Sequence, residues 1–417
     1  MKNIAIIGSG ISGLTSAYLL SQKHQVTVFE QNDYIGGHTA TVDVNVGGQN
    51  YAVDTGFIVF NNKTYPNFLK LLSQIGIDRQ ETEMSFSVQN LNSGLEYNGN
   101  NLNTLFAQRS NIFKPSFWNL ISEILRFNKM CKERHAADDM STKETLGDFL
   151  DLNRFSAHFA EHYILPMGAA IWSTSLTQMR DFQLKFFIQF FHNHGLLNIN
   201  DRPQWYVIPG GSRNYIKPLT KNFADKIQLN SKIKHVNRLP TGVEIHFEDA
   251  PVQHFDEVIF ACHSDQALAL LNDATALEQQ ILGQLEYANN EVVLHTDEAM
   301  LPKAKLAWAS WNYRLSDDHK RPASVTYDMN ILQGIESEHT FCVTLNQTKD
   351  IAEDKILRKF NYMHPVFNQN SMQAQQKREM ICGHNFTHFT GAYWYNGFHE
   401  DGVRSAVDVA KRFGCHL

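Results

Sequence analysis

The apolar positions at the start of the chain fall into two short runs separated by a stretch of small residues. The runs cover residues 4–7 and 26–29, and the small-residue stretch covers residues 11–20. Uninterrupted apolar runs of this length are typical of buried parallel strands, and a helix between two such strands makes a βαβ unit. The pattern therefore predicts that the chain opens with a strand, a helix and a second strand parallel to the first.

A glycine-rich turn joins the first run to the predicted helix, and an acidic residue closes the second run. The turn has the spacing Gly-x-Gly-x-x-Gly, and the acid is Glu30. The glycines permit the tight turn, the approach of a pyrophosphate to the backbone and close packing of helix on strand. The helix N-terminus attracts phosphates, and Glu30 can accept hydrogen bonds from ribose hydroxyls. We expect a dinucleotide site formed by Glu30 with Gly8, Ser9, Gly10, Ile11, Ser12 and Gly13.

Apolar patterning predicts further elements along the chain. Strand-like runs cover residues 242–247, 256–261, 324–327 and 340–345, and helical spacing covers residues 114–135, 154–165 and 178–195. Strands and helices are mixed in the middle of the chain, so that part is predicted to be α+β.

Composition narrows the class of protein. Lys and Arg number 37 and Asp and Glu number 43, so the net charge of −6 gives no overall attraction to nucleic acid. The five cysteines are scattered without a C-x-x-C pair, which is typical of reduced thiols in the cytoplasm. A strand beginning at residue 4 leaves no room for a signal peptide, and no apolar run approaches the roughly 18 residues of a membrane span. We expect a cytoplasmic protein of two domains, because 417 residues exceed one ordinary core.

Four further segments carry a resemblance to a known family. They are Gly36-Gly37, Asp54-x-Gly56, Pro209-Gly210-Gly211 and the C-terminal Gly-Phe-His-Glu-Asp-Gly of residues 397–402. With the glycine turn, they resemble the flavin-containing amine oxidase superfamily, which includes monoamine oxidases, protoporphyrinogen oxidase and phytoene desaturases. The resemblance implies an α/β fold: a Rossmann-type FAD-binding domain with an inserted α+β substrate domain. FAD is expected to bind non-covalently, because no cysteine lies in the C-terminal motif.

The chain departs from the family pattern at two positions. His38 stands where an arginine usually follows the two glycines, and Asn32 stands where a basic residue is common. Both changes remove a cation near the pyrophosphate, so backbone N–H groups are expected to carry more of the binding.

The resemblance also implies which residues contact the flavin. Phe398 is expected to face the ring, with Tyr395 as a weaker candidate for the substrate pocket. Gly402 and Val403 are expected to open the final helix and to direct its N-terminus at the ring, and the backbone of Ile233 is expected to reach the adenine. Beyond the glycine turn and Glu30, the implied cofactor residues are Gly36, Gly37, His38, Thr39, Gly56, Phe57, Ile233, Asp401, Gly402 and Val403.

The wide spread of these motifs implies that the FAD-binding domain is discontinuous. We expect it to comprise residues 1–75, 205–290 and 385–417. Residues 76–204 and 291–384 are expected to form the substrate domain.

Four other patterns each have two interpretations. His158, Glu161 and His162 match the spacing of some zinc sites, but no third ligand is evident, so a packed or solvated helix face is preferred and no metal is expected. The phenylalanines between residues 182 and 191 either line a tunnel for an apolar substrate or belong to the core. The basic helix that carries Trp118 either lies on a membrane surface or is solvated. Lys303 or Lys305 either faces the flavin or lies on the surface. The second interpretation is preferred for the last three patterns.

The remaining question is the substrate. Residues 308–313 and the C-terminal motif resemble a bacterial branch of the superfamily associated with enzymes that modify unsaturated or cyclopropane fatty acids. The first hypothesis is an FAD-dependent oxidoreductase, in which flavin N5 takes a hydride from a C–H bond of an apolar, unsaturated lipid chain. The alternatives are an amine oxidase acting on a small amine and a non-catalytic binding protein on the same fold. Peripheral membrane contact stays open, and the sequence predicts no oligomeric state.

Overall fold

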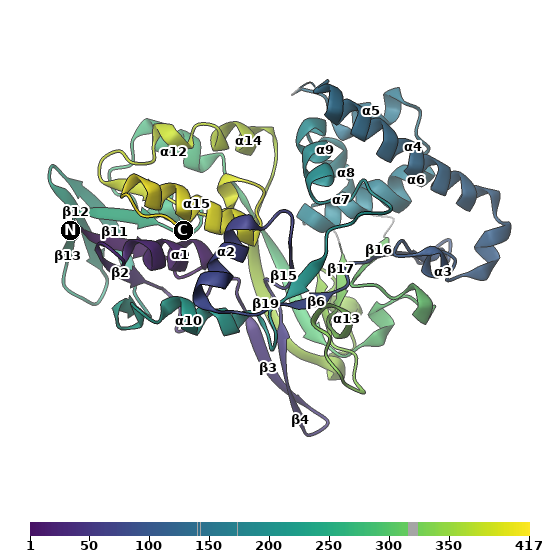
Figure 1. The fold of residues 1–417 in the computed structure, drawn as a ribbon, viewed down its shortest axis with the longest axis horizontal. Helices are drawn as coiled ribbons and strands as arrows, with labels where there is room; N and C mark the ends of the chain where they lie inside the picture. Colours follow the sequence, from purple (N-terminus) through teal and green to yellow (C-terminus); the bar gives the residue numbers. More distant parts are fainter. Residues whose placement is uncertain (140, 142, 173, 316–323) are drawn as a thin grey trace.

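A parallel sheet forms the first layer of the protein. A computed structural model describes residues 1–139, 141, 143–172, 174–315 and 324–417. The five strands lie in the order β10-β2-β1-β14-β20, and every neighbouring pair is parallel. Their bounds are Asn3–Ile7 for β1, Gln25–Phe29 for β2, Ile227–Gln228 for β10, Glu257–Phe260 for β14 and Thr387–Phe389 for β20. Segments far apart in the chain therefore build one sheet (Figure 1).

Helices α1 and α15 pack against each other beside this sheet. Helix α1 covers Ile11–Leu20 and α15 covers His399–Arg412, so the two ends of the chain lie close together (Figure 1). The close approach depends on Gly402, because a Cβ atom there would lie 2.7 Å from Ile11 Cγ2 and 3.0 Å from Ser12 Oγ. Additional elements in this part of the chain are α2 (Pro66–Ile75), α10 (Ile216–Thr220), α11 (Ser264–Leu270), α12 (Ala276–Gly283), α14 (Gln369–Gln375) and the antiparallel strands β11 (Ile233–Leu239), β12 (Gly242–Phe247) and β13 (Gln253–Phe255).

A seven-stranded sheet lies beside the first layer. Its order is β19-β15-β18-β17-β16-β7-β8, and its pairs are antiparallel except for the parallel pair β16–β7. The bounds are Ile356–Pro365 for β19, Tyr287–His295 for β15, Cys342–Leu345 for β18, Val325–Asp328 for β17, Trp311–Leu315 for β16, Phe86–Asn90 for β7 and Glu96–Asn98 for β8. Helix α13 (Met329–Gln333) follows β17 directly.

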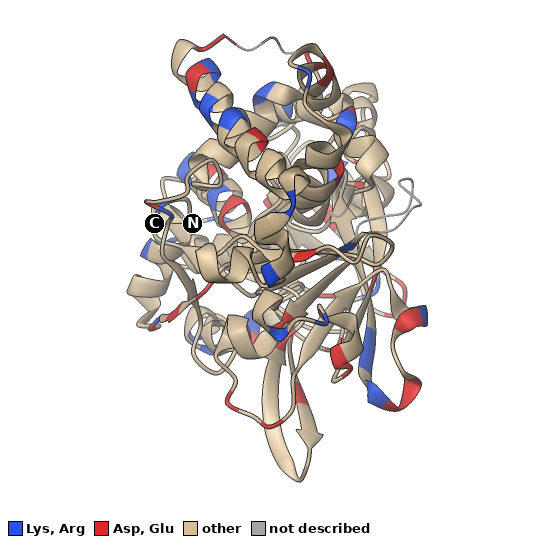
Figure 2. Cartoon of the chain, turned by 90° about the vertical axis from the view of Figure 1, so that its right-hand side faces the viewer, with Lys and Arg blue, Asp and Glu red and all other residues tan. Residues whose placement is uncertain are grey.

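A group of helices stands beside the seven-stranded sheet, in the upper right of Figure 1. Its longest member is α4, which covers Pro115–Ala137, has proline at its first position and carries both basic and acidic residues (Figure 2). The proline suits this position because the first N–H of a helix has no intrahelical partner. The other helices are α3 (Leu102–Leu105), α5 (Leu146–Leu152), α6 (Ala157–Phe159), α7 (Leu165–Trp172), α8 (Leu176–Arg180) and α9 (Leu184–Asn193).

Short strands connect these parts. The hairpin β3–β4 (Thr41–Val46 and Gln49–Asp54) projects at the bottom of Figure 1. A small sheet joins β5 (Phe60–Asn61), β9 (Trp205–Val207) and β6 (Gln80–Thr82). One large buried core surrounds the parallel sheet and another fills the helical group, and each therefore stabilises its own part of the fold.

Most predicted elements are present with small changes of boundary, but two predictions are wrong in detail. The expected helix over 178–195 is interrupted, because α8 ends at Arg180 and α9 begins at Leu184. The final helix begins at His399 and not at Gly402, because the Phe398 N–H donates to Asp401 Oδ2 over 2.9 Å and closes the first turn earlier. No helix in the described part of the chain is long and apolar enough to cross a membrane.

Candidate functional site

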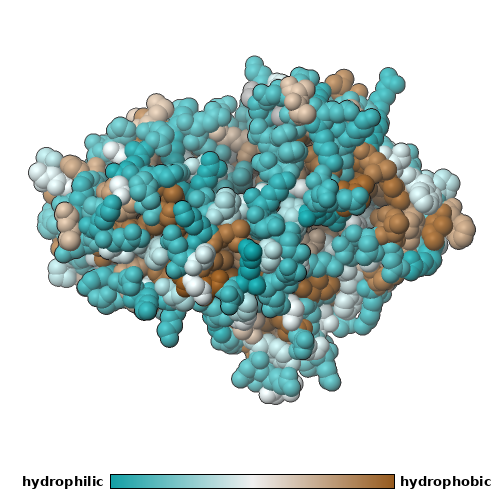
Figure 3. Space-filling view, viewed as in Figure 1, coloured by the Kyte–Doolittle hydropathy of each residue, from teal (hydrophilic) through white to brown (hydrophobic). Residues whose placement is uncertain are grey.

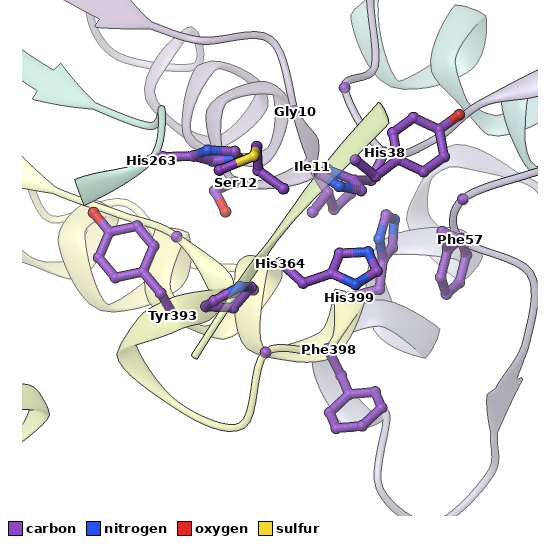
Figure 4. A pocket seen from close by; sticks show the side chains of 18 of the residues that line it. Gly10, Ile11, Ser12, His38, Phe57, His263, His364, Tyr393, Phe398 and His399 are labelled. Carbon is purple, nitrogen blue, oxygen red and sulfur yellow. The ribbon is translucent and has the colours of Figure 1, made fainter. Parts of the chain in front are cut away.

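A cavity of about 880 Å³ runs from the glycine turn toward the helical group. Its wall includes the N-terminus of α1, the segment after Gly36, the start of α15 and the end of β19 (Figure 4). The volume lies within the usual range for sites that enclose a ligand. Of the predicted residues, Gly8, Ser9, Gly10, Ile11, Ser12, Glu30, Gly36, Gly37, His38, Gly56, Phe57, Ile233 and Phe398 line it.

The three glycines of the turn differ in what surrounds them. A Cβ atom at Gly13 would lie 1.9 Å from the Gly8 carbonyl oxygen, so this position holds helix α1 against the turn. Gly8 has φ +107°, in the left-handed region that favours glycine. A Cβ atom at Gly10 would meet nothing within 4 Å, although this residue faces the cavity. The space over Gly10 therefore suits a ligand that approaches the backbone.

Glu30 is buried and holds the turn through its carboxylate. Oε2 accepts hydrogen bonds from the Ser9 N–H (3.0 Å) and the Ser9 hydroxyl (2.7 Å). Oε1 accepts from the backbone and side-chain nitrogens of Asn32, both at 2.9 Å. A carboxylate has about four acceptor positions. Ribose hydroxyls that bind Glu30 must therefore take the place of the Ser9 hydroxyl or the Asn32 amide.

The loop after Gly36 folds over the glycine turn. A Cβ atom at Gly37 would lie 3.2 Å from Gly10 Cα, and one at Gly56 would lie 2.2 Å from the His38 carbonyl oxygen. Phe57 donates its N–H to that same oxygen over 2.7 Å. These contacts bring the glycine turn, the Gly36-Gly37 segment and the Asp54-x-Gly56 segment into one wall.

Polar contacts join this wall to distant motifs. The Ser212 N–H donates to both carboxylate oxygens of Asp54, over 2.9 and 3.0 Å, which links the Pro-Gly-Gly loop to the end of β4. Burial raises the pKa of Asp54 to about 6 against these hydrogen bonds. Thr39 lies behind the wall, where its hydroxyl contacts the Tyr215 hydroxyl at 2.5 Å, and Tyr215 contacts His399 Nε2 at 2.8 Å.

The start of α15 forms one side of the cavity. The ring of His399 stacks on Phe57, with centroids 3.7 Å apart and planes at 8°. Phe398 projects from the residue before the helix (Figure 4). Burial, followed by the proximity of His38, holds the pKa of His399 well below its usual value. Phe398 and His399 therefore bring the N-terminus of α15 to the cavity, where the His399 ring and the first peptide groups of the helix lie close together.

The other residues predicted in this motif lie outside the cavity wall. Asp401 caps α15, Gly402 faces α1 and Val403 is buried in the core. Glu400 accepts from the N–H groups of Asn67 and Phe68, so its carboxylate caps helix α2. These side chains point away from the cavity because α15 begins at His399, and the helical repeat then directs positions 400–403 toward α1 and α2.

Tyr395 is also turned away from the cavity. Its hydroxyl donates to Asp408 over 2.5 Å, and the Arg404 guanidinium lies 3.9 Å from its ring centroid. Tyr393 lines the cavity in its place. Lys303 and Lys305 do not line it, and Lys305 instead pairs with Glu298 over 3.6 Å.

The far part of the cavity is aromatic and apolar. Phe190 stacks on Phe398 at 5.2 Å between ring centroids, Trp172 lies 4.8 Å from Phe190, and Trp311 contacts Tyr327 at 5.0 Å. Among the described residues, Glu30 is the one Asp, Glu, Lys or Arg side chain in the wall, and it lies beside the glycine turn. Other apolar lining residues of this part are Met84, Phe86, Met167, Ile171, Leu196 and Phe367.

One ionisable side chain stands among these aromatic rings. His194 stacks on Phe190 at 3.9 Å and lies 5.7 Å from Phe398. Its Nδ1 lies 2.9 Å from the Phe190 carbonyl oxygen and must donate to it, which leaves Nε2 without the proton. Burial lowers the pKa of His194 to about 4, so the ring is neutral at pH 7.

The structure also distinguishes between the two interpretations of the phenylalanine pattern and of the histidine pair. Of the five phenylalanines between residues 182 and 191, Phe190 lines the cavity, whereas Phe187 and Phe191 are fully buried core residues. The ring nitrogens of His162 contact the His158 carbonyl oxygen at 3.0 Å and the Asn90 amide at 2.9 Å, so both are engaged within the protein. In the described part of the chain, no group of three or more potential metal ligands gathers.

Sequence reasoning missed several wall residues. His263, Tyr362 and His364 are separated in sequence from every motif, and Trp172, His194 and Trp311 belong to the helical group and the second sheet. A single sequence carries no signal for such contacts, because they arise when separate elements pack together. Two of these residues had a local signal, because His263 lies two residues after the predicted strand over 256–261 and Trp311 lies in the run over 308–313 that resembles the bacterial branch.

Comparisons with known proteins agree with this architecture. A family model described as flavin containing amine oxidoreductase matches residues 11–328. The 1-hydroxycarotenoid 3,4-desaturase of Flavobacterium sp. (strain P99-3) is 43% identical over 76 residues, which cover 18% of this chain and 14% of that protein. The zeta-carotene desaturase of Zea mays is 34% identical over 76 residues, covering 18% and 13%. The chain thus matches about a seventh of the length of these relatives.

Solved structures of low sequence identity share the fold. Cyclohexylamine oxidase from Brevibacterium oxydans IH-35A has a TM-score of 0.69 at 13% identity, covering 99% of each chain. The CLA-producing fatty acid isomerase from P. acnes has a TM-score of 0.69 at 15% identity, covering 99% of this chain and 98% of that one.

Proposed function

Because the chain belongs to the flavin-containing amine oxidoreductase family, we propose that it is an FAD-dependent oxidoreductase acting on an apolar, unsaturated chain. The observation that carries the choice of substrate is the aromatic part of the cavity, where no Asp, Glu, Lys or Arg side chain lies among the described residues. An ammonium group there would lose its hydration without gaining a carboxylate partner. An alkyl or polyene chain gains from the same burial.

The wall near the glycine turn fits FAD. The open space over Gly10 would admit a pyrophosphate against the N-terminus of α1, and Glu30 with Ile233 would contact the adenosine end. Phe57, Phe398 and His399 would border the flavin ring. Asp401, Gly402 and Val403 would act indirectly, by fixing the start of α15. In this proposal, the FAD-binding domain comprises residues 1–75, 205–290 and 385–417.

FAD supplies an acceptor for a hydride from the substrate. The aromatic rings would orient the chain and exclude water. As a hydride leaves one carbon, the next carbon loses a proton in the same step, and the electron pair of that second C–H bond forms the double bond. His194 lines the cavity, and its Nε2 would take this proton because Nδ1 already donates to the Phe190 carbonyl oxygen.

Mixing experiments under anaerobic conditions test this proposal. Oleic acid and unsaturated phosphatidylglycerol should bleach the visible flavin absorbance of the purified protein, whereas putrescine and cyclohexylamine should not. Bleaching by the amines alone would favour an amine oxidase, and bound flavin that none of these compounds reduces would favour a non-catalytic binding protein. His194→Gln should retain FAD and lose most of the bleaching rate, because glutamine cannot take up the proton.

A lipid substrate also requires access from a membrane, and one surface suits such contact. Leu102, Ile112, Phe113 and Trp118 are 76%, 42%, 85% and 50% exposed, and they gather around α3 and the start of α4. Figure 3 shows hydrophobic side chains on this edge of the molecule. Lys114, exposed beside Phe113 at the start of α4, would attract anionic lipid head groups.

Vesicle sedimentation tests this contact. The protein should sediment with phosphatidylglycerol vesicles, and Phe113→Ser should weaken sedimentation several-fold. Leu152→Ser removes an equally apolar side chain, 72% exposed on α5, and should have no effect. Equal sedimentation of both variants with the wild type would contradict the assignment of this surface.

A further inference from the structure

Three histidines from separate elements surround one side of the glycine turn. His38 follows Gly37, His263 precedes α11 and His364 lies in β19. The ring centroid of His38 lies 5.8 Å from that of His364 and 6.3 Å from that of His263. Figure 4 shows the three rings around Gly10, Ile11 and Ser12. The cluster therefore lies where the N-terminus of α1 meets the cavity.

This part of the cavity lacks a permanent cation. Among the described residues, no Lys or Arg side chain lines the wall. A pyrophosphate bridge carries two negative charges, and a helix N-terminus offers the equivalent of only about half a positive charge. An anion at the turn would remain largely uncompensated unless a neighbouring side chain became charged.

His38 is the member of the cluster with an unsatisfied group. Its buried Nε2 has no hydrogen-bond partner among the described residues. Burial, followed by the proximity of His364 and then His263, lowers the pKa of His38 to about 3. Burial likewise lowers the pKa of His364 to about 4. In the absence of an anion, the rings are therefore neutral at pH 7.

We propose that His38 takes up a proton from solvent when FAD binds and becomes the counter-ion of the pyrophosphate, with His263 and His364 completing its surroundings. The inference rests on the proposed binding of FAD at the glycine turn. It adds a side-chain charge to the expectation that backbone N–H groups carry more of the pyrophosphate binding. It also gives cofactor affinity a pH dependence that a permanent arginine would not produce.

The groups facing His38 set the sign of this dependence. The Tyr362 ring lies 5.2 Å from His38 and its hydroxyl contacts Thr55 at 2.9 Å, so it adds no charge. Tyr287 stacks on His263 at 4.2 Å and is also neutral, because burial raises its pKa. His399 is neutral. Of the nearest carboxylates, Asp265 acts on His263, where it opposes the lowering of the pKa by burial, and Glu30 accepts a hydrogen bond from Ser9 in the glycine turn.

The pyrophosphate is thus the group that changes on binding, and it raises the pKa of His38 in the complex. Between the pKa of the free protein and that of the complex, binding consumes a proton. The dissociation constant of FAD should therefore rise with pH, by up to about tenfold per pH unit for one proton.

Calorimetric titration of flavin-free protein with FAD measures the proton directly. At pH 7, the heat of binding should differ between phosphate and Tris buffers by an amount corresponding to uptake of up to one proton. His38→Gln should lose this buffer dependence and the slope of affinity with pH. His38→Arg should bind FAD with an affinity that is nearly independent of pH. His339→Gln changes a histidine outside the cavity wall and should behave as the wild type.

The possible outcomes separate this inference from the proposed function. Equal heats in the two buffers, or unchanged proton uptake in His38→Gln, would overturn the role of His38 while leaving FAD binding intact. Failure of the wild-type protein to bind FAD at any pH would overturn both. If His38→Gln does not fold, the wild-type buffer comparison and His38→Arg still decide the matter.

Discussion

Alanine at Gly10 should weaken FAD binding without lowering the stability of the flavin-free protein, whereas alanine at Gly13 should lower that stability. Gly10 has φ −67° and ψ 179°, which alanine adopts readily, and a Cβ atom there meets no protein atom within 4 Å. Gly10→Ala should therefore leave the flavin-free protein as stable as the wild type, or more stable by about 0.4–1 kcal/mol. The added methyl group would instead occupy space that a pyrophosphate needs.

The expected loss of FAD affinity in Gly10→Ala follows from the phosphate contact that the added methyl group would displace. A hydrogen bond to a charged group contributes about 1.5–3 kcal/mol, so losing one phosphate contact at the turn corresponds to about one to two decades in the dissociation constant of FAD. Gly13→Ala differs, because its Cβ atom would lie 1.9 Å from the Gly8 carbonyl oxygen. Overpacking of this kind costs about 1–3 kcal/mol or more, and the flavin-free protein should lose stability.

Thermal melts of flavin-free protein and titrations with FAD, followed by flavin fluorescence, measure both effects. Gly10→Ala should melt near the wild-type temperature and bind FAD weakly, whereas Gly13→Ala should melt at a lower temperature. Wild-type FAD affinity in Gly10→Ala would refute the placement of the pyrophosphate. A melting temperature of Gly10→Ala as low as that of Gly13→Ala would refute the claim that the space over Gly10 is free.

Three further changes have expected outcomes. Glu30→Ala should weaken FAD binding by about one to two decades, seen as loss of flavin on dialysis, because ribose loses a charge-assisted partner; full flavin occupancy would point to another ribose ligand. Gly402→Val should lower the melting temperature even without FAD, because its side chain would meet Ile11 at the contact of α1 with α15; an unchanged melt would contradict that packing. Burial raises the pKa of Asp401 from 3.8 to about 7, so ionisation of the unfolded chain removes stability as pH rises from about 4 to 7. Asp401→Asn should lessen this loss by up to about 1.4 kcal/mol per pH unit in denaturant unfolding, and parallel pH profiles would refute the expectation.

Local sequence patterns correctly predicted the βαβ unit that carries the glycine turn. The glycine turn, the two flanking strands and Glu30 occupy one continuous βαβ unit, so spacing alone places them together. The predicted resemblance to the flavin-containing amine oxidase superfamily and the α/β fold class are confirmed by the family match and the shared fold.

The C-terminal motif shows where pattern reasoning fails. The glycine at position 402 was predicted to approach the flavin, but helix α15 begins three residues earlier, at His399. The side chains that follow are therefore rotated toward α1 and α2. The start of the helix depends on a hydrogen bond from the Phe398 N–H to Asp401, which strand and helix periodicity do not reveal.

The substrate part of the cavity depends on contacts between distant segments. Phe190 was one of five similar phenylalanines, and only tertiary packing selects it for the wall. His194 had no motif to mark it, although it lies three to four residues from two of those phenylalanines. Its neutral ring is a consequence of burial, which composition and spacing cannot predict.

The most direct test of the central claim is chromatographic identification of the nucleotide that acid releases from the purified protein. One FAD per chain should be released, leaving the polypeptide at the mass of its sequence, since binding is expected to be non-covalent. A protein that releases no flavin, releases a nicotinamide dinucleotide instead, or keeps flavin attached after acid treatment would contradict the assignment of this cavity as a non-covalent FAD site.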